Sequence, residues 1–230
     1  MSEEKLYVYG VTDESRGGVS VEGVDGATEI RSVDYRSLSA IVSDIGTLEP
    51  DVSEGNRRAH DEVLQAVAVG EDENGTDGGR TVVPMPFGRV FEGERPLKDE
   101  LRNGRGAFRS ALLSVDGCVE VGVKVVAPGD ESVDEAAVRE AVDDELDSLA
   151  QGATAAERRG DRLVCDRSYL VAREDREAFD RAVDRLRDRV EDLTVRYDGP
   201  RAPYSFVDVE LGVASRAMRE RLTGTSEAIR

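Results

Sequence analysis

The stretch from Asp116 to Val126 constrains the fold of this chain more than any other part of its sequence. Successive side chains of a β-strand point to opposite faces of the sheet, so residues two apart share a face. One face of this stretch carries Val119, Val121, Val123 and Val125, and the other carries Cys118, Glu120, Gly122, Lys124 and Val126. The pattern predicts a long strand whose valine face packs on a hydrophobic core.

The residues before this strand predict a mixture of strands and helices. Ser53 is suited to cap a helix, and Gly104 and Gly106 weaken the centre of a later one. Pro84 and Pro86 exclude a central strand over 81–91, because each proline removes a backbone hydrogen-bond donor. That segment is expected to form a short strand, a kinked turn and a second extended piece. Helices are predicted over 53–70 and 96–115, strands over 5–12, 27–33 and 38–45, and loops over 16–26 and 71–79.

The residues after the strand continue this mixed pattern. Ser132 is expected to open a helix, and a charged helix with an apolar stripe is expected from Asp175. Asp198 to Pro203 is rich in turn-forming residues and predicts a corner. Helices are predicted over 132–151, 175–190 and 214–229, and strands over 162–172, 193–197 and 204–211.

Strands and helices mix without strict alternation, which favours an α+β fold over one doubly wound sheet. We expect two ferredoxin-like domains with mostly antiparallel sheets and helices on one face of each. The predicted boundaries are 1–114 for the first domain, 115–210 for the second and 211–230 for a C-terminal helical tail.

The charge of the chain is strongly negative. It has 49 acidic and 31 basic residues and a formal net charge of −18, and lysine occurs only at positions 5, 98 and 124. In molar salt the Debye length is about 3 Å, so acidic self-repulsion is screened. We therefore expect a protein of a salt-loaded cytosol that loses structure in dilute buffer, the alternative being an ordinary acidic cytosolic protein. Circular dichroism that is unchanged from molar to millimolar salt would exclude the first interpretation.

Several classes of function are disfavoured by composition. No apolar run approaches the ~20 residues of a membrane span, and no secretory signal is evident, so the chain is expected to stay in the cytoplasm. An overall negative charge repels nucleic acid. A single histidine and two distant cysteines cannot form a closed zinc site, and no metal or cofactor site is predicted.

Three residue types remain as candidates for chemistry. His60 and Asp61 are adjacent on a predicted helix, so they point in different directions and do not form a catalytic dyad by spacing alone. A half-buried histidine that packs on the sheet is the favoured interpretation. Cys118 and Cys165 lie among valines and are expected to be buried, reduced thiols.

Six segments in register carry a resemblance to a known family. They are Leu6-Tyr-Val-Tyr-Gly10, Leu38-Ser-Ala-Ile-Val-Ser43, His60-Asp61-x-Val-Leu64, Val82-Val-Pro-Met-Pro-Phe-Gly-Arg-Val-Phe91, Asp116-Gly-Cys-Val-Glu-Val-Gly-Val-Lys124 and Gly199-Pro-Arg-Ala-Pro-Tyr-Ser-Phe-Val207. Together they resemble the GvpF/GvpL family of gas vesicle proteins, and the composition resembles its haloarchaeal members. The acidic loop at 71–79 departs from this resemblance and reads as a surface insertion.

The resemblance implies an accessory or minor structural role in the nucleation and assembly of gas vesicles. The implied partners are the major hydrophobic shell protein of the GvpA type, which such a protein keeps from aggregating, and other accessory gas vesicle proteins. No enzymatic activity and no cofactor are implied. The alternatives are a small-molecule-binding regulatory module and an enzyme that uses His60.

Two proline-containing corners are the candidate contacts with the shell protein. A partner of an aggregation-prone subunit needs an apolar surface surrounded by charge. Prolines hold a corner rigid and lower the entropy lost on binding. The candidate residues are Pro84, Met85 and Phe87 in the first corner and Tyr204 and Phe206 in the second. The alternative is that both corners fill the ends of their domain cores.

Overall fold

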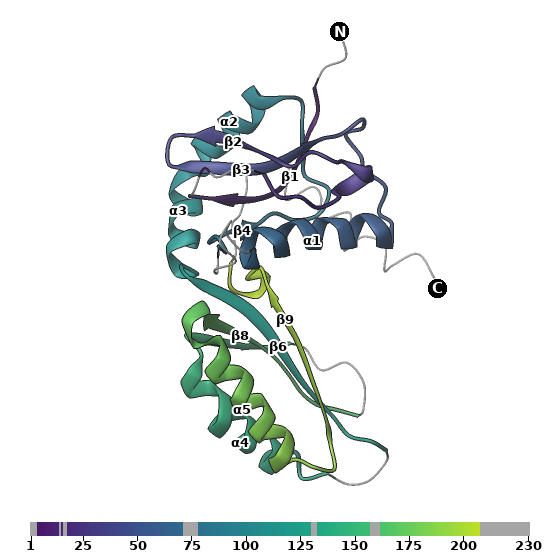
Figure 1. The fold of residues 1–230 in the computed structure, drawn as a ribbon, viewed down its shortest axis with the longest axis vertical. Coiled ribbons are helices and arrows are strands. Elements are labelled where there is room, and N and C mark those ends of the chain that lie inside the picture. Colours follow the sequence, from purple (N-terminus) through teal and green to yellow (C-terminus); the bar gives the residue numbers. More distant parts are fainter. Residues whose placement is uncertain are drawn as a thin grey trace, which may run out of the picture.

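The computed structural model describes residues 4–13, 15, 18–70, 78–129, 133–156 and 162–207. Most of the loop predicted at 71–79, Ser132 and the tail helix predicted at 214–229 lie outside the described residues. The described chain forms two antiparallel sheets with helices packed on them, so the predicted α+β class with two domains is confirmed (Figure 1).

The first domain contains a sheet of five strands. They are β1 (Leu6–Thr12), β2 (Arg31–Tyr35), β3 (Leu38–Asp44), β4 (Val83–Pro84) and β5 (Val90–Phe91). The order is β2-β3-β1-β4, and β5 also pairs with β1, always antiparallel. Residues between β4 and β5 leave the sheet and return to it, which is the kinked turn that the two prolines predict.

Helices cover both faces of this first sheet, where the sequence pattern predicts one covered face. Helix α1 (Glu54–Val69) packs against one face through Val63, Leu64 and Val67. Helices α2 (Glu94–Asn103) and α3 (Arg105–Ser114) pack against the other. Because both faces are covered, every residue of β1 is buried. Ser53 accepts a hydrogen bond from the Asn56 amide and caps α1 as predicted.

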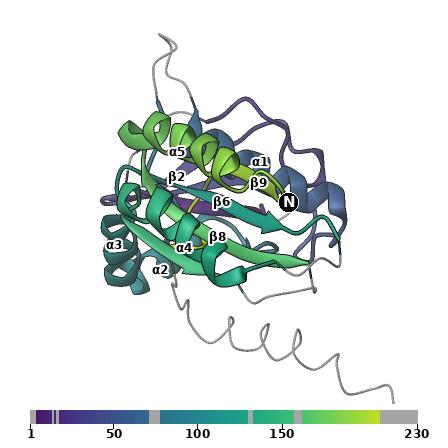
Figure 2. The same ribbon diagram turned by 90° about the horizontal axis from the view of Figure 1, so that it is seen from below.

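The second domain has the β-α-β-β-α-β order of a ferredoxin-like unit. Its elements are β6 (Cys118–Val126), α4 (Glu135–Leu146), β7 (Gly152–Ala155), β8 (Leu163–Ala172), α5 (Arg176–Arg189) and β9 (Thr194–Arg201). The strand order is β7-β8-β6-β9. Val121, Val123 and Val125 face α4 and α5 in one hydrophobic cluster, so the predicted valine face is confirmed. Figure 2 shows these two helices side by side on one face of the sheet.

Several predicted boundaries in the first domain and in the segment after β9 are wrong. The single helix predicted over 96–115 is two helices that meet at Gly104, where a β-carbon would lie 2.9 Å from the Phe108 ring. The strand predicted from residue 27 begins at Arg31. Within the strand predicted over 204–211, Tyr204–Phe206 forms a 3-10 turn, and residues 208–211 lie outside the described part.

Three more differences concern the second domain. The helix predicted to begin at residue 132 begins at Glu135, because Asp134 caps α4. Strand β7 was not predicted, because Gly-Ala-Thr-Ala lacks the large β-branched residues that mark strands. Strand β9 continues through the predicted corner to Arg201, because an edge strand tolerates proline.

The two domains are joined by more than the short connection between α3 and β6. Arg173 of the second domain donates hydrogen bonds to the carbonyl oxygens of Ala68 and Arg80 in the first. Ala202, which follows β9, is buried in the hydrophobic cluster beneath α1. We still propose a domain boundary near residue 114. After Pro200 the chain returns to the first domain and contacts it through Ala202.

A candidate docking groove between the two domains

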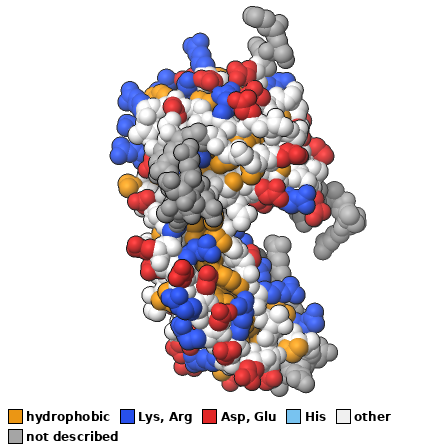
Figure 3. Space-filling view, in the orientation of Figure 1, with side chains coloured by type: hydrophobic (Ala, Val, Ile, Leu, Met, Phe, Trp, Pro, Cys, Tyr) orange, Lys and Arg blue, Asp and Glu red, His pale blue; other side chains and the backbone are white. Residues whose placement is uncertain are grey.

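A groove of about 610 Å³ lies where the two domains meet. It is lined by α1, by Phe87 from the connection between β4 and β5, by Glu120 of β6, by Asp198 to Ala202 at the end of β9, and by Tyr204 and Ser205. Figure 3 shows the surface hollowed between the domains, below the place that α1 occupies in Figure 1. The groove is therefore built from parts of the chain that are far apart in sequence.

His60 fastens the connection between β4 and β5 to α1. The imidazole Nε2 donates to the Met85 carbonyl oxygen at 3.1 Å, so the neutral ring accepts at Nδ1 from the Tyr7 hydroxyl at 2.8 Å. The Tyr7 oxygen in turn accepts from the amide of Gly88 at 3.1 Å. Gly88 has a φ of 86°, a conformation that glycine adopts without strain. Met85 and Gly88 of this connection are thus positioned by one buried network.

Burial lowers the pKa of His60 to about 4, although Asp61 and the Met85 carbonyl favour the charged form. The ring is therefore neutral at pH 7 and both of its nitrogens are engaged. This arrangement matches the predicted structural histidine, and the structure buries it more deeply than the sequence suggests.

Phe87 forms an aromatic wall of the groove. Its ring contacts those of Tyr7 and His60 edge-on, with centroids 6.0 and 5.8 Å apart. The Arg57 guanidinium lies 5.6 Å from the centroid of the same ring. The Phe87 side chain is half-buried, so part of it faces the groove.

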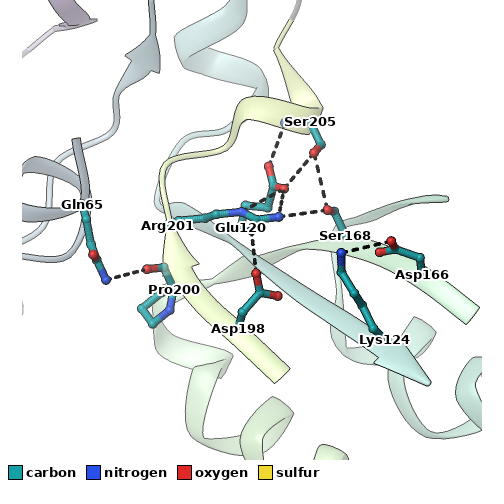
Figure 4. A network of polar contacts seen from close by, with 9 residues as sticks. All are labelled: Gln65, Glu120, Lys124, Asp166, Ser168, Asp198, Pro200, Arg201 and Ser205. Carbon is teal, nitrogen blue, oxygen red and sulfur yellow. Dashed lines mark hydrogen bonds and ion pairs between the residues drawn. The ribbon is translucent and has the colours of Figure 1, made fainter. Parts of the chain in front are cut away.

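A charged network centred on Glu120 forms the opposite wall (Figure 4). Glu120 is fully buried, and its Oε1 accepts from Arg201 Nη2 at 2.8 Å and from the Ser205 hydroxyl at 2.7 Å. Its Oε2 accepts from the Ser205 amide at 2.7 Å. Arg201 also pairs with Asp198 at 2.8 Å. A buried carboxylate with this many donors anchors the segment that follows β9 to the middle of the sheet.

The same segment reaches across the groove to α1. The Tyr204 hydroxyl donates to Asp61 Oδ1 at 3.1 Å, and the Gln65 side-chain amide donates to the Pro200 carbonyl at 3.3 Å. Tyr204 remains 38% exposed. These contacts hold Tyr204 on the rim of the groove.

The structure brings together one residue from each predicted corner. Phe87 and Tyr204 both line the groove. Pro84 and Met85 are buried, and Met85 belongs to the core of the first domain, so the expectation that they are exposed is wrong. Phe206 is half-buried against Leu170 and Gly152, outside the groove lining. The idea that the corners fill core ends therefore holds for Pro84 and Met85.

The structure contains a converging polar cluster around Glu120 that the sequence pattern does not indicate. Glu120 and Arg201 are 81 positions apart, and only the pairing of β6 with β9 brings them together. A signal was present in Glu120, an acidic residue inside a valine-rich strand. The alternation of side chains places Glu120 on the face of β6 opposite the valines. It does not reveal that Arg201 and Ser205 cover this face at Glu120.

The remaining candidates have structural roles. Cys118 and Cys165 are buried free thiols, as predicted, and burial raises the pKa of each. Within residues 4–207 as described, no group of histidine, cysteine and carboxylate side chains is arranged to hold a metal ion. No helix in the described part of the chain has the length and apolar character needed to cross a membrane.

Comparison with known proteins gives a consistent result. The family model described as gas vesicle synthesis protein GvpL/GvpF matches residues 5–140 and 130–208. Gas vesicle protein F2 of Halobacterium salinarum is 48% identical over 214 residues, covering 92% of this chain and 96% of the relative. Gas vesicle protein F of Haloferax mediterranei is 43% identical over 210 residues, covering 91% and 96%.

Solved structures support the fold independently. The crystal structure of GvpF from Anabaena superposes with a TM-score of 0.78 at 19% identity, covering 90% of this chain and 97% of that one. GvpF from Microcystis aeruginosa gives a TM-score of 0.75 at 18% identity, with 89% and 99% covered. The halophilic character expected from composition agrees with the haloarchaeal relatives. This chain belongs to the GvpL/GvpF family of gas vesicle proteins.

Proposed function

We propose that this protein acts in gas vesicle nucleation and assembly by binding the hydrophobic shell protein and preventing its aggregation. The groove between the domains is the proposed contact. The observation that carries this assignment is the convergence of Phe87 and Tyr204, from separate parts of the chain, on one groove. Family membership supports the gas vesicle role, and the groove supports the choice of surface.

The groove combines the two properties that such a contact needs. Its apolar surface is supplied by the half-buried Phe87 and Pro200, onto which an apolar side chain of the shell protein packs. Its rim carries charge from Arg57, Asp61 and Asp198, which keeps the complex hydrated. The walls are held by the His60 and Glu120 networks, so little conformational entropy is lost on binding.

A double substitution tests the contact. Replacing Phe87 and Tyr204 by alanine removes the two aromatic side chains from the groove and is expected to weaken capture of the shell protein about tenfold or more. The measurement is co-purification of the shell protein with tagged full-length protein in molar salt. Capture at full strength by a folded double variant would exclude the groove as the contact.

Leu48 and Val52 provide a matched control. They are large apolar residues that are 42% and 60% exposed and lie outside the groove lining. Their double alanine variant removes exposed apolar surface of similar kind and is expected to capture the shell protein normally. Equal losses in both double variants would indicate unspecific adhesion.

A small-molecule-binding module is the second candidate, and the groove volume favours it, since ligand pockets span about 300–1,000 Å³. The buried polar groups that line the groove make a small-molecule site less suitable. His60 and Glu120 are buried and already satisfied by protein partners, so they offer a ligand no free hydrogen bond. A thermal-shift screen of metabolites that raises the melting temperature of the wild type, but not of the Phe87/Tyr204 variant, would favour this candidate.

A further inference from the structure

Leu113 is the most exposed large apolar residue in the described part of the chain, at 73%. It lies in the last turn of α3, next to Leu112, which is buried in the core of the first domain. A single exposed leucine is ordinary in a soluble protein. Its meaning therefore depends on the side chains around it.

The charges on α3 differ from those on the rest of the molecule. The helix contains Arg105 and Arg109 and no acidic residue, whereas every other α-helix of the described chain contains several. This occurs in a protein with a net charge of −18. Figure 3 shows basic side chains along the edge of the first domain where Figure 1 places α2 and α3.

The two arginines lack partners among the described residues. Arg105 is half-buried and its Nε has no hydrogen-bond partner there, and the exposed Arg109 side chain forms no hydrogen bond or ion pair with a described residue. The arginines of α5 contrast with them, because Arg181 pairs with Glu177 and Arg187 with Asp184. Arg105, Arg109 and Leu113 are spaced four residues apart, so they follow one another along one side of α3. We call these three residues the α3 face.

We propose that the α3 face is a docking surface, separate from the groove, for an acidic helix of a partner protein. Arginines one turn apart match carboxylates one turn apart on a facing helix, about 5.4 Å along its axis. Guanidinium groups bind carboxylates through paired hydrogen bonds. Leu113 supplies an apolar contact at the end of the same face. Nucleic acid is the less suitable occupant, because a long row of phosphates would extend beyond the two arginines over acidic surface, whereas a short acidic helix can place its carboxylates on α3 alone.

A designed peptide tests this surface. The probe is a synthetic amphipathic helix with glutamates on successive turns of one side and a leucine beside them. It is titrated into isotope-labelled full-length protein at about 1 M salt, where ion pairs in direct contact persist. Saturable NMR shifts confined to residues 102–114 are expected. The double variant R105A/R109A is expected to bind about tenfold more weakly, and L113A to bind more weakly than the wild type.

Three controls decide the outcome. A peptide with lysine in place of glutamate is expected not to bind. The variant R181A/R187A, which removes two paired arginines of α5, and the Phe87/Tyr204 groove variant are expected to bind like the wild type. The proposal is overturned by absence of binding, by full affinity in R105A/R109A, or by a DNA duplex that binds this face as tightly as the peptide. Because the groove variant keeps this affinity, failure here is distinguishable from failure of the shell-protein proposal.

Discussion

Replacing Glu120 by alanine is expected to lower the free energy of unfolding by about 3 kcal/mol. The carboxylate is fully buried and accepts hydrogen bonds from Arg201 and from two groups of Ser205. Its removal leaves the Ser205 amide and hydroxyl without their strongest acceptor and Arg201 without its buried partner. Arg201 is partly exposed and keeps its ion pair with Asp198 in the variant. The expected loss of stability is therefore at the lower end of the ~3–5 kcal/mol typical of a broken buried ion pair.

The measurement is urea unfolding at constant molar salt, with the midpoint and slope compared between variants. Lys124→Ala is the matched control, because Lys124 lies on the same strand face and pairs with Asp166 at 3.1 Å near the surface. Its loss is expected to cost less than about 1 kcal/mol. Similar costs for the two variants would contradict the anchoring role of Glu120. The same Glu120 variant is expected to bind the shell protein more weakly, because Tyr204 lies between Arg201 and Ser205, the two residues that Glu120 anchors.

Replacing His60 by glutamine is expected to make the protein less sensitive to acid. Burial lowers the folded-state pKa of His60 to about 4, below the ordinary value of 6.5. Between these values the unfolded chain binds a proton that the folded chain does not, so stability falls as the pH falls from 6.5 through 4. The full effect is about 3 kcal/mol. Glutamine can still donate to Met85 and accept from Tyr7, but it does not titrate.

The measurement is urea unfolding of the wild type and His60→Gln at pH 7, 6, 5 and 4 in molar salt. Both proteins carry the same acidic surface, so the difference between their free energies of unfolding reports on the histidine alone. We expect the variant to become more stable relative to the wild type as the pH falls. Parallel profiles at every pH would show that burial does not lower the pKa of His60.

The sequence predicts the elements whose periodicity is strong. The valine alternation of β6 gives its length and its buried face, and Ser53 marks the start of α1. Weaker signals fail for physical reasons. Strand β7 consists of small residues whose pairing with β8 is imposed by the sheet. In the sequence, Gly104 only weakens the centre of one predicted helix. In the structure, α2 ends and α3 begins at Gly104, where the Phe108 ring lies too close for a side chain.

The candidate site could be predicted only in part. Turn-rich, proline-containing segments point to Phe87 and Tyr204, because local composition marks both corners. Their meeting in one groove depends on the chain returning to the first domain after β9, where Ala202 is buried beneath α1. The burial of Met85 and the pairing of Glu120 with Arg201 depend on the same tertiary contacts. Periodicity along the chain carries no information about such contacts.

The solubility of the shell protein tests the central proposal most directly. The shell protein is produced together with the wild type, the Phe87/Tyr204 variant or the Leu48/Val52 variant, and the supernatant is assayed after centrifugation in molar salt. We expect the shell protein to remain in the supernatant with the wild type and the Leu48/Val52 variant and to sediment with the groove variant. Equal sedimentation in all three cases would contradict the account.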